Sequence, residues 1–407
     1  IDAGIALLFG IAYFVLLCLT LDIGIPSDES FYFAAGEQYS RWFDDLADDP
    51  ANAFSKEVVD KRFGYNGEHP ALPKILFGAS WRLFGKMHDP KEEPWARTWY
   101  DGGKPPAELL GLVSESTAFR LPALLVSSLL VVLVYLFGVE FFNRRVAFGA
   151  ALFWMFTPHA FWHAHLSCFD MPIAVLWFLT AWCFLKAEAG GWRWAIATGV
   201  AWALALSTKH NAFFLPIVFV VWFLATRWRE FGMPRDGGGV RLKLPTIPLS
   251  FFAMLVISPI LYYALWPRLW HEPIKHFKWY LSFHMNHVMY WAYFFGHLYT
   301  KPPYPVGYSF LMHAITTPVP TVLLSIVGLG MAVAAWISGR LRSVSSRIAA
   351  FADSLPVRGR GTLLFVFLNF FIPFLAIATP KVPIFGGTKH WLPGVPFLAL
   401  FAGLAFD

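Results

Sequence analysis

Long apolar runs separated by short polar loops make up most of the chain. The first run, residues 3–21, is about long enough to cross the hydrocarbon core of a bilayer. Further apolar runs of helical length follow at residues 117–142, 146–158, 170–186, 194–207, 211–225, 247–266, 315–337, 362–378 and 392–406. The pattern predicts an all-α polytopic membrane protein with about ten or more transmembrane helices.

The stretch from residue 22 to residue 116 breaks this pattern, because it is polar, acidic and too long for a simple connector. Apolar side chains recur in it at helical spacing, first over residues 31–46 and again over residues 72–83. We expect both segments to form amphipathic helices that lie in the membrane interface. Residues 86–106 are rich in proline and glycine and predict an irregular loop.

We expect residues 1–407 to form one transmembrane domain, with residues 22–116 as its long outer loop. The chain begins without Met and stops at Asp407 just after an apolar run, so pieces are expected to be missing at both termini.

The composition supports a membrane protein. Of the 407 residues, 57% are hydrophobic and only 14% are charged, which is outside the range of soluble domains. The net charge of +6 does not indicate a nucleic-acid partner, because membrane proteins carry excess Lys and Arg in their loops and no nucleic-acid-binding motif accompanies it. Cys18, Cys168 and Cys183 are scattered through apolar segments, so neither disulfides nor a cysteine metal site is indicated.

Basic residues mark alternate loops, beginning with Arg144 and Arg145 and continuing within residues 186–193, 227–243 and 340–360. By the positive-inside rule these loops are cytoplasmic. The loops on the opposite face then hold nearly all candidates for chemistry. They are Asp28, Glu29, Glu68, His69, His159, His163, His165, Asp170, Lys209, His210, Arg268, His271, His284, His287, Lys301, Lys381, Lys389 and His390.

Asp28 and Glu29 directly follow the first apolar run, where the membrane meets water. A carboxylate in such a semi-dry environment can act as a general base. The alternative is that both acids are solvated helix caps, since perturbed carboxylates mark sites only in a fraction of cases.

Two further motifs open helices and have an equally simple alternative. His69 precedes the second amphipathic segment, and Asp170 begins an apolar run. Each is also a plausible polar cap, because acids are favoured at helix N-termini.

Two cation-bearing loops point to an anionic ligand. Lys209 and His210 lie in a short polar island between apolar runs, and Lys389 and His390 lie in the last outer loop. A lysine at this depth can pair with a lipid phosphate. The alternative for Lys209 is a side chain that snorkels to the headgroups.

The sequence does not indicate a metal site, but it does not exclude the use of a divalent cation. His159, His163 and His165 have loose ligand spacing with Asp170 nearby, but they match no strong zinc signature. The aromatic-rich residues 266–304 fit an interfacial belt, and aromatic rings also suit sugars or a polyprenyl chain.

Taken together, the chain resembles the GT-C glycosyltransferases, in particular the protein O-mannosyltransferase and lipid A aminoarabinose transferase group. The resemblance covers essentially the whole chain, in the family's motif order. The motifs are Asp28-Glu29, His69-Pro70-Ala71-Leu72, Arg120-Leu121-Pro122, Asp170-Met171-Pro172, Ser207-Thr208-Lys209-His210 and Lys389-His390-Trp391-Leu392-Pro393. Two positions depart from the pattern, since Ala71 replaces a proline and His210 replaces a glycine beside the phosphate-binding lysine.

The resemblance implies transfer, with inversion, of a sugar from a polyprenyl-phosphate donor to a hydroxyl acceptor on a protein or lipid. It implies that Asp28 is the general base and that Asp170 positions the acceptor. Lys209, helped by His210, Lys389 or His390, would stabilise the departing phosphate, and Glu29, His69 and Arg268 would complete the substrate-binding set. It also implies an integral protein of the bacterial inner membrane, among membrane lipids, with its active site facing the periplasm.

Two other classes of protein compete with this one. A transporter would carry ionisable residues near the bilayer midplane, whereas here they lie at helix ends. A catalytically silent scaffold subunit of a larger membrane complex is the second alternative, and the His210 departure is compatible with it.

Overall fold

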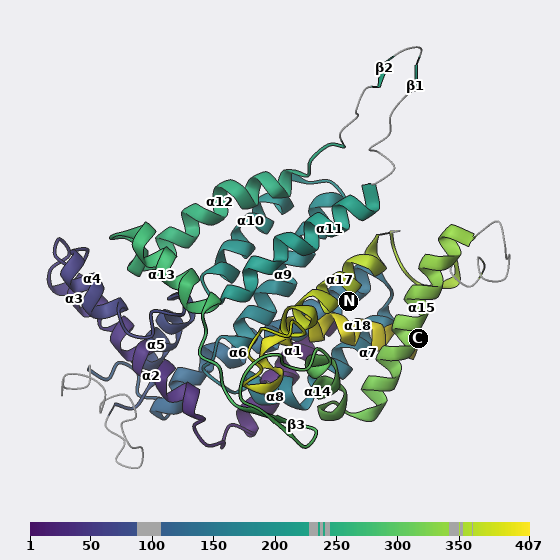
Figure 1. Ribbon diagram of the computed structural model, residues 1–407. Helices are drawn as coiled ribbons and strands as arrows, with labels where there is room; N and C mark the ends of the chain where they lie inside the picture. The colour runs from purple at the N-terminus through teal and green to yellow at the C-terminus, as the bar shows by residue number, and fades with distance from the viewer. Residues whose placement is uncertain are drawn as a thin grey trace.

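The structure is a computed structural model that describes residues 1–87, 107–227, 235–236, 239–240, 245–341, 350, 353–359 and 361–407. All ten predicted apolar segments are helical, in the predicted order (Figure 1). They form α1 (Asp2–Leu19), α6 (Glu115–Phe141), α7 (Arg144–Met155), α9 (Asp170–Glu188), α10 (Trp192–Leu206), α11 (Leu215–Arg227), α12 (Leu249–Leu265), α15 (Val319–Leu341), α17 (Thr362–Ile377) and α18 (Val395–Phe406).

Length and apolar composition mark many of these helices as membrane spans. Five segments of the described chain are long and apolar enough to cross a membrane: Asp2–Leu19, Glu115–Phe141, Asp170–Glu188, His210–Arg227 and Val319–Ser338. Shorter apolar helices cover Leu249–Leu265, Thr362–Ile377 and Leu392–Phe406. The prediction of an all-α polytopic membrane protein is therefore confirmed.

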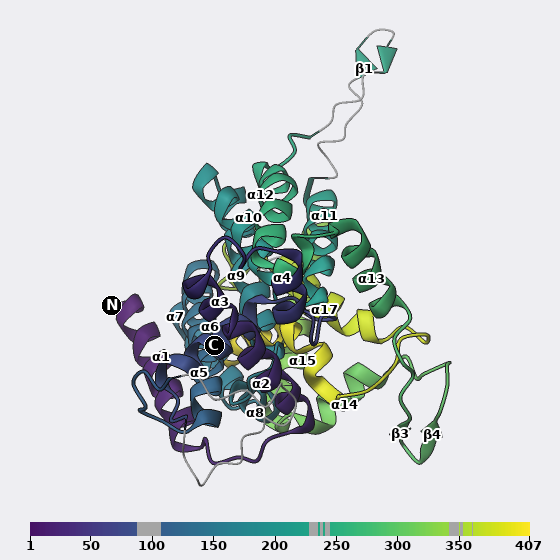
Figure 2. The same ribbon diagram turned by 90° about the vertical axis from the view of Figure 1, so that its left-hand side faces the viewer.

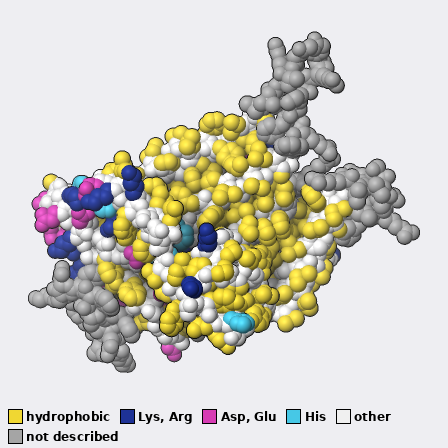
Figure 3. Space-filling model, in the orientation of Figure 1, with side chains coloured by type: hydrophobic (Ala, Val, Ile, Leu, Met, Phe, Trp, Pro, Cys, Tyr) yellow, Lys and Arg dark blue, Asp and Glu magenta, His cyan; other side chains and the backbone are white. Residues whose placement is uncertain are grey.

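The outer surface of these helices is apolar. On α12, Leu255 and Ile260 are 72% and 63% exposed, and on α15 Leu323 is 58% exposed. Figure 3 shows this apolar surface across the middle of the molecule, with charged side chains gathered at the end where α3 (Trp42–Asp48) and α4 (Lys56–Phe63) lie. A continuous apolar surface of this extent fits lipid contact, since soluble proteins rarely expose one.

The helices pack around α9, which contacts α6 and α10, while α18 packs on α7 and α15. Stacked aromatic rings fill the interior, and Phe184 of α9 lies 4.0 Å from the ring of Phe219 in α11. Because α9 is largely enclosed, its N-terminal residue Asp170 is held at a defined place. This helix therefore anchors the end of the molecule where the outer loops meet.

The long outer segment and the basic start of α7 lie at opposite ends of the bundle, as the sequence predicts. The chain termini lie on the right of Figure 1, where Arg144 of α7 pairs with Asp2 of α1 at 2.7 Å. The outer segment lies on the left, as α2 (Ser27–Ser40), α3, α4 and α5 (Leu72–Phe84). Six other basic residues predicted to be cytoplasmic lie outside the described residues: Arg229, Arg241, Lys243, Arg342, Arg347 and Arg360.

The remaining elements are short. They are α8 (Pro158–Ala164), α13 (Pro273–Met285), α14 (Tyr308–Thr316) and two hairpins, β1–β2 (Arg235–Asp236 with Gly239–Val240) and β3–β4 (Ala292–Phe294 with His297–Tyr299). Figure 2 shows the β3–β4 hairpin projecting away from the helices. It carries the exposed aromatic residues Trp291 and Tyr293, at 75% and 73% exposure, which fits the interfacial belt expected for residues 266–304.

The predicted amphipathic segments are helical, but the first divides at Arg41 into α2 and α3. In α5 the side chains that face the protein are Lys74, Phe77 and Trp81, while Leu76 and Leu83 are exposed. The apolar stripe seen in the sequence therefore points outward, as it would in a helix that lies on lipid. Of the predicted loop at 86–106, residues 88–106 lie outside the described part.

A close backbone contact joins α5 to α2, the helix that carries Asp28 in its first turn. A Cβ added to Gly78 would lie 2.0 Å from the carbonyl oxygen of Gly36. We expect Gly78→Ala to destabilise the protein by about 1–3 kcal/mol, because neither backbone can move without disturbing the α2–α5 packing. Thermal unfolding of the purified protein in detergent measures this loss.

The matched control is Gly330→Ala on α15, where an added Cβ meets no atom within 4 Å among the described residues. It should leave the unfolding temperature unchanged or slightly higher, since alanine is the better helix former. Equal unfolding temperatures for the two variants would contradict the proposed role of the α2–α5 contact.

Candidate active site

Asp28 lies in the first turn of α2, after Pro26 holds the backbone extended. Its carboxylate accepts a hydrogen bond of 2.8 Å from the ammonium of Lys389, which lies in the 3₁₀ helix Gly387–His390. Asp28 is 53% exposed whereas Lys389 is only 16% exposed. The carboxylate of Asp28 is therefore accessible, while its cationic partner Lys389 is largely buried.

A second ion pair lies deeper. Asp170 begins α9, and its Oδ1 accepts a hydrogen bond of 2.6 Å from Nζ of Lys209, in the extended connection between α10 and α11. Both residues are buried, and Nδ1 of His163 lies 4.0 Å from Oδ2 of Asp170. A buried charge is tolerated when it is paired, so each side chain requires the other.

The two pairs form one electrostatic unit. Burial lowers the pKa of Lys389, but the nearby carboxylates of Asp170 and Asp28 outweigh it, and the pKa ends above its usual value. We call Asp28, Asp170, Lys209 and Lys389 the ion-pair cluster. Four outer segments far apart in sequence contribute these alternating charges.

Glu29 has a different environment from its neighbour Asp28. It is fully buried, and both carboxylate oxygens accept hydrogen bonds from the guanidinium of Arg120 in α6, at 2.9 and 2.6 Å. The backbone N–H of Ser167 donates a third bond of 2.8 Å. Arg120 also donates to the carbonyl of Gly24 at 3.0 Å, so it ties the segment before α2 to the transmembrane helices.

Four histidines from separate elements lie beside the ion-pair cluster. The ring centroids of His210 and His284 are 4.2 Å apart, and those of His69 and His284 are 6.2 Å apart. His390 follows Lys389, and its carbonyl accepts a hydrogen bond of 3.0 Å from the side chain of Asn211, the neighbour of His210. We call His69, His210, His284 and His390 the imidazole cluster. The sequence analysis named His284 as an outer-loop candidate but did not place it in the site.

Lys74 supports the segment that carries His69, although the sequence did not identify it as a site residue. It is fully buried, and its ammonium donates to the Tyr39 hydroxyl and to the carbonyls of Asn66 and His69, at 2.8, 2.7 and 2.8 Å. Burial lowers the pKa of Lys74 well below its usual value. The lysine thus holds the chain segment that carries His69. The signal in the sequence was a lysine within the predicted amphipathic segment, at a position that is buried in α5.

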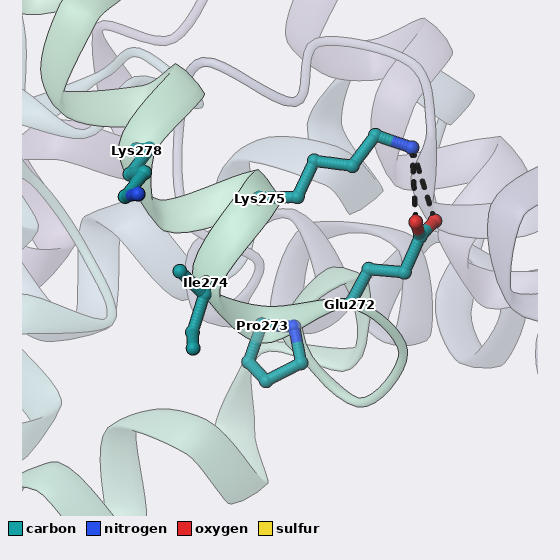
Figure 4. Close-up of a pocket in the computed structure, with 5 residues that line it drawn as sticks. All are labelled: Glu272, Pro273, Ile274, Lys275 and Lys278. Carbon is teal, nitrogen blue, oxygen red and sulfur yellow. Dashed lines mark hydrogen bonds and ion pairs between the residues drawn. The ribbon is translucent and has the colours of Figure 1, made fainter.

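Arg268 makes different contacts. Its Nη1 donates to the carbonyl of Gly64 at 3.2 Å, and its guanidinium lies over the Trp279 ring at 5.0 Å. Neither contact reaches the ion-pair cluster. Near it in sequence, a surface hollow of about 620 Å³ lies at the start of α13, where Lys275 pairs with Glu272 (Figure 4). Neither cluster contributes a residue to this hollow.

The metal-ligating candidates are dispersed. Within the described residues, no group of three or more His, Cys, Asp and Glu side chains is arranged to hold a metal ion. His165 is engaged by Thr20 at 2.9 Å and by the Phe161 carbonyl at 2.8 Å. Asp28 and Asp170 are each paired with a lysine ammonium, so this donor set does not fit a divalent cation.

The Glu29–Arg120 pair predicts a large stability effect. We expect Glu29→Gln to destabilise the protein by about 3–5 kcal/mol, because it leaves a buried guanidinium without an anion. Denaturation of the purified protein in detergent measures the loss. Asp60→Asn, which breaks an exposed ion pair with Lys56, should leave stability nearly unchanged. Similar losses in both variants would contradict the bridging role of Glu29.

The imidazole cluster predicts acid sensitivity. Burial lowers the pKa of His284 to about 4, whereas an unfolded histidine titrates near its ordinary value of 6.5. Between these pH values the unfolded state binds a proton that the folded state does not, so stability falls as the pH decreases from about 6.5 to about 4. We expect His284→Asn to reduce this loss in unfolding temperature.

The control for acid sensitivity is His297→Asn, since His297 is an exposed residue of strand β4. Its unfolding temperature should depend on pH as in the wild type. A His284→Asn curve parallel to the wild-type curve from pH 7.5 to pH 4 would refute the prediction.

Comparison with known proteins bears on the fold and the family. Residues 108–263 match the family model of the dolichyl-phosphate-mannose-protein mannosyltransferases. No curated protein matches the sequence. Among solved structures, ArnT from Cupriavidus metallidurans in the apo state is 18% identical, with 99% of this chain and 59% of ArnT covered and a TM-score of 0.59.

Two further solved structures show the same likeness. ArnT from the same organism bound to undecaprenyl phosphate is 17% identical, with 99% and 60% covered and a TM-score of 0.56. The Archaeoglobus fulgidus oligosaccharyltransferase in its apo form is 11% identical, with 99% and 49% covered and a TM-score of 0.55. The chain thus spans about half to three fifths of the length of these proteins. The predicted resemblance is confirmed, and the chain has the fold of the GT-C glycosyltransferases.

Proposed function

We propose that this chain is a membrane glycosyltransferase that moves a sugar from a polyprenyl-phosphate donor to a hydroxyl acceptor. The observation that carries the proposal is the ion-pair cluster, in which the accessible carboxylate of Asp28 is paired with Lys389 and the buried carboxylate of Asp170 is paired with Lys209. A base beside cations at lipid headgroup depth is what transfer from a lipid phosphate requires. The undecaprenyl phosphate bound by ArnT supports the class of donor.

In the proposed reaction, the acceptor hydroxyl oxygen attacks the anomeric carbon of the sugar while Asp28 takes its proton. The bond between the anomeric carbon and the phosphate oxygen breaks, and its electron pair leaves with the polyprenyl phosphate. Attack opposite the leaving group inverts the anomeric configuration. Lys389 donates a hydrogen bond of 2.8 Å to the Asp28 carboxylate and so holds it in place before the reaction.

The departing phosphate gains negative charge, which Lys209 and Lys389 are placed to stabilise. Each ammonium has three N–H donors, so its carboxylate partner leaves others for phosphate oxygens. Such preorganised charges are effective because they need no rearrangement during the reaction. We assign to Asp170 the positioning of Lys209, in addition to the acceptor-positioning role that the family resemblance implies for it.

Glu29 and Arg268 fit supporting roles better than direct contact with substrate. Both oxygens of Glu29 are engaged by Arg120, and Arg268 is held by Gly64 and Trp279. We propose that Glu29 positions the first turn of α2, and through it Asp28. Residues 1–407 would then act as one transmembrane domain whose outer loop supplies the base.

We further propose that the site faces the periplasm from a bacterial inner membrane. The ion-pair cluster includes Asp28 of α2, a helix on the left of Figure 1. Arg144 and Arg145 begin α7 and pair with Asp2 and Asp407, next to the chain termini on the right. Because basic residues favour the cytoplasmic side, the candidate site belongs on the opposite side.

The general-base assignment predicts the effect of removing one carboxylate. Asp28→Asn keeps the shape of the side chain but removes the proton acceptor, so turnover should fall roughly 10²–10⁴-fold. The measurement is sugar transfer from a radiolabelled polyprenyl-phosphate donor in membranes that contain equal amounts of each variant. Donor binding should persist, because the phosphate contacts come from Lys209 and Lys389.

Asp22→Asn is the matched control, because Asp22 is an exposed acid on the same connecting segment. It should transfer sugar at the wild-type rate. Equal rates for wild type and Asp28→Asn would remove Asp28 from the chemistry. Absence of transfer by the wild type with every donor would favour a scaffold subunit instead.

A further inference from the structure

We propose that the imidazole cluster is a subsite for the uncharged hydroxyl groups of the donor's sugar, and that His210 helps to determine which sugar is accepted. This inference rests on the proposed function, and it adds a class of sugar to it. The class is a neutral hexose or pentose, as distinct from an amino sugar.

The first support is unused hydrogen-bonding capacity. Nδ1 of His69, Nδ1 of His210 and Nε2 of His390 are buried and have no hydrogen-bond partner in the part of the chain that the structure describes. Buried polar atoms are normally paired, so three such nitrogens in one cluster point to an absent partner. His284 is oriented by its Nε2, which lies 3.0 Å from the carbonyl of Glu68.

The second support is the charge of these rings. Burial lowers the pKa of His69 well below its usual value, and it lowers the pKa of His284 to about 4 and that of His390 to about 3. At neutral pH these three rings are therefore uncharged, and an uncharged imidazole has one donor and one acceptor nitrogen. In His284 the donor is already bonded to the Glu68 carbonyl, which leaves Nδ1 as an acceptor. A sugar hydroxyl also donates and accepts, so the two groups match. A phosphate, which only accepts when ionised, matches the lysines better.

The third support is location. His210 directly follows Lys209 and His390 directly follows Lys389. Besides burial, the nearby Lys209 ammonium lowers the pKa of all four imidazoles, so the imidazole cluster lies close to this ammonium group, which we propose holds the phosphate. In a polyprenyl-phosphate sugar, the sugar is bonded to that phosphate and must lie beside it. A phosphate on the lysines therefore brings the sugar within reach of the imidazoles.

Aromatic rings complete the surroundings. His69 lies 4.7 Å from the ring of Phe169, His284 lies 4.6 Å from that of Tyr280, and His390 lies 4.6 Å from that of Phe385. Such rings can pack on the C–H faces of a sugar, while the imidazoles contact its hydroxyl groups.

The same geometry disfavours an amino sugar. A cationic substituent needs a carboxylate, but Asp28 and Asp170 are each paired with a lysine. The carboxylate of Glu68 accepts a hydrogen bond of 2.7 Å from the Asn66 side-chain amide and, against the larger effect of burial, raises the pKa of the nearby Lys74. Uncharged imidazoles beside two ammonium groups would leave a sugar ammonium without an anionic partner. His210, which occupies the position of the family's glycine, brings an imidazole to this place and so makes this chain differ from the family pattern.

The test compares two lipids that differ only in the sugar. Binding of polyprenyl phosphate and of polyprenyl-phosphate hexose to the full chain in nanodiscs is measured for wild type, His284→Leu and His210→Gly. Each variant should bind the hexose lipid roughly tenfold more weakly, because it loses a hydrogen-bonding group, and should bind the bare lipid phosphate as the wild type does. His284→Asn, which retains a donor and an acceptor, should lose less.

A matched control lies on the same helix. His276 of α13 also has a buried, unpartnered Nε2 among the described residues, but its charged neighbours are Arg268, Asp60, Glu272 and Lys275. His276→Leu should therefore bind both lipids normally. Lys209→Ala should weaken both, since it removes a contact to the phosphate that they share.

The outcomes separate the two proposals. Equal weakening of both lipids by His284→Leu, or no change in either, would overturn the sugar subsite while leaving the proposed function intact. Tighter binding of an aminohexose lipid than of the hexose lipid by the wild type would overturn the preference for an uncharged sugar. A wild-type protein that binds neither lipid would overturn the proposed function and this inference with it.

Discussion

The buried pair between Glu29 and Arg120 determines where the outer segment meets the transmembrane helices. Arg120 lies one turn inside α6, where an isolated charge would be costly, and Glu29 satisfies it with two hydrogen bonds. The same guanidinium holds the Gly24 carbonyl, and Glu29 also accepts from the Ser167 backbone. Three segments are thereby joined at one point, and the accessible carboxylate of Asp28 lies beside that point.

The ion-pair cluster follows from this constraint. Once α2 begins at a fixed place, Asp28 meets Lys389, and the N-terminus of α9 brings Asp170 to Lys209. The buried pair Asp170–Lys209 can lie beside the more accessible pair Asp28–Lys389, because each carboxylate lies against an ammonium. The arrangement also keeps the carboxylate proposed as the base close to two lysine ammonium groups. Lys74 extends this support by holding the segment that carries His69 through neutral acceptors alone.

The clusters divide the chemistry between charged and neutral groups. Lysines suit a phosphate, and uncharged imidazoles suit hydroxyl groups. His210 belongs to both regions, since it follows Lys209 in sequence and packs on His284 in space. A single substitution relative to the family motif thus changes a position where the two regions meet.

Much of the fold could be predicted from the sequence, because a membrane helix must satisfy its own backbone hydrogen bonds and present apolar side chains to lipid. Because of that requirement, each span can be recognised as an apolar run in the sequence, as for α6 and α15. The gathering of Asp28, Asp170, Lys209 and Lys389 at one end could also be anticipated, since alternate loops share a membrane face.

Pairing and orientation were decided by tertiary structure. The sequence presents Asp28 and Glu29 as equivalent neighbours, yet one side chain is accessible and the other is enclosed by Arg120, 91 residues away. Likewise Arg268 shares an outer loop with His284, but only His284 reaches the imidazole cluster. Periodicity identifies which residues share a helix face, but the partner of a buried charge depends on long-range packing that local patterns do not encode.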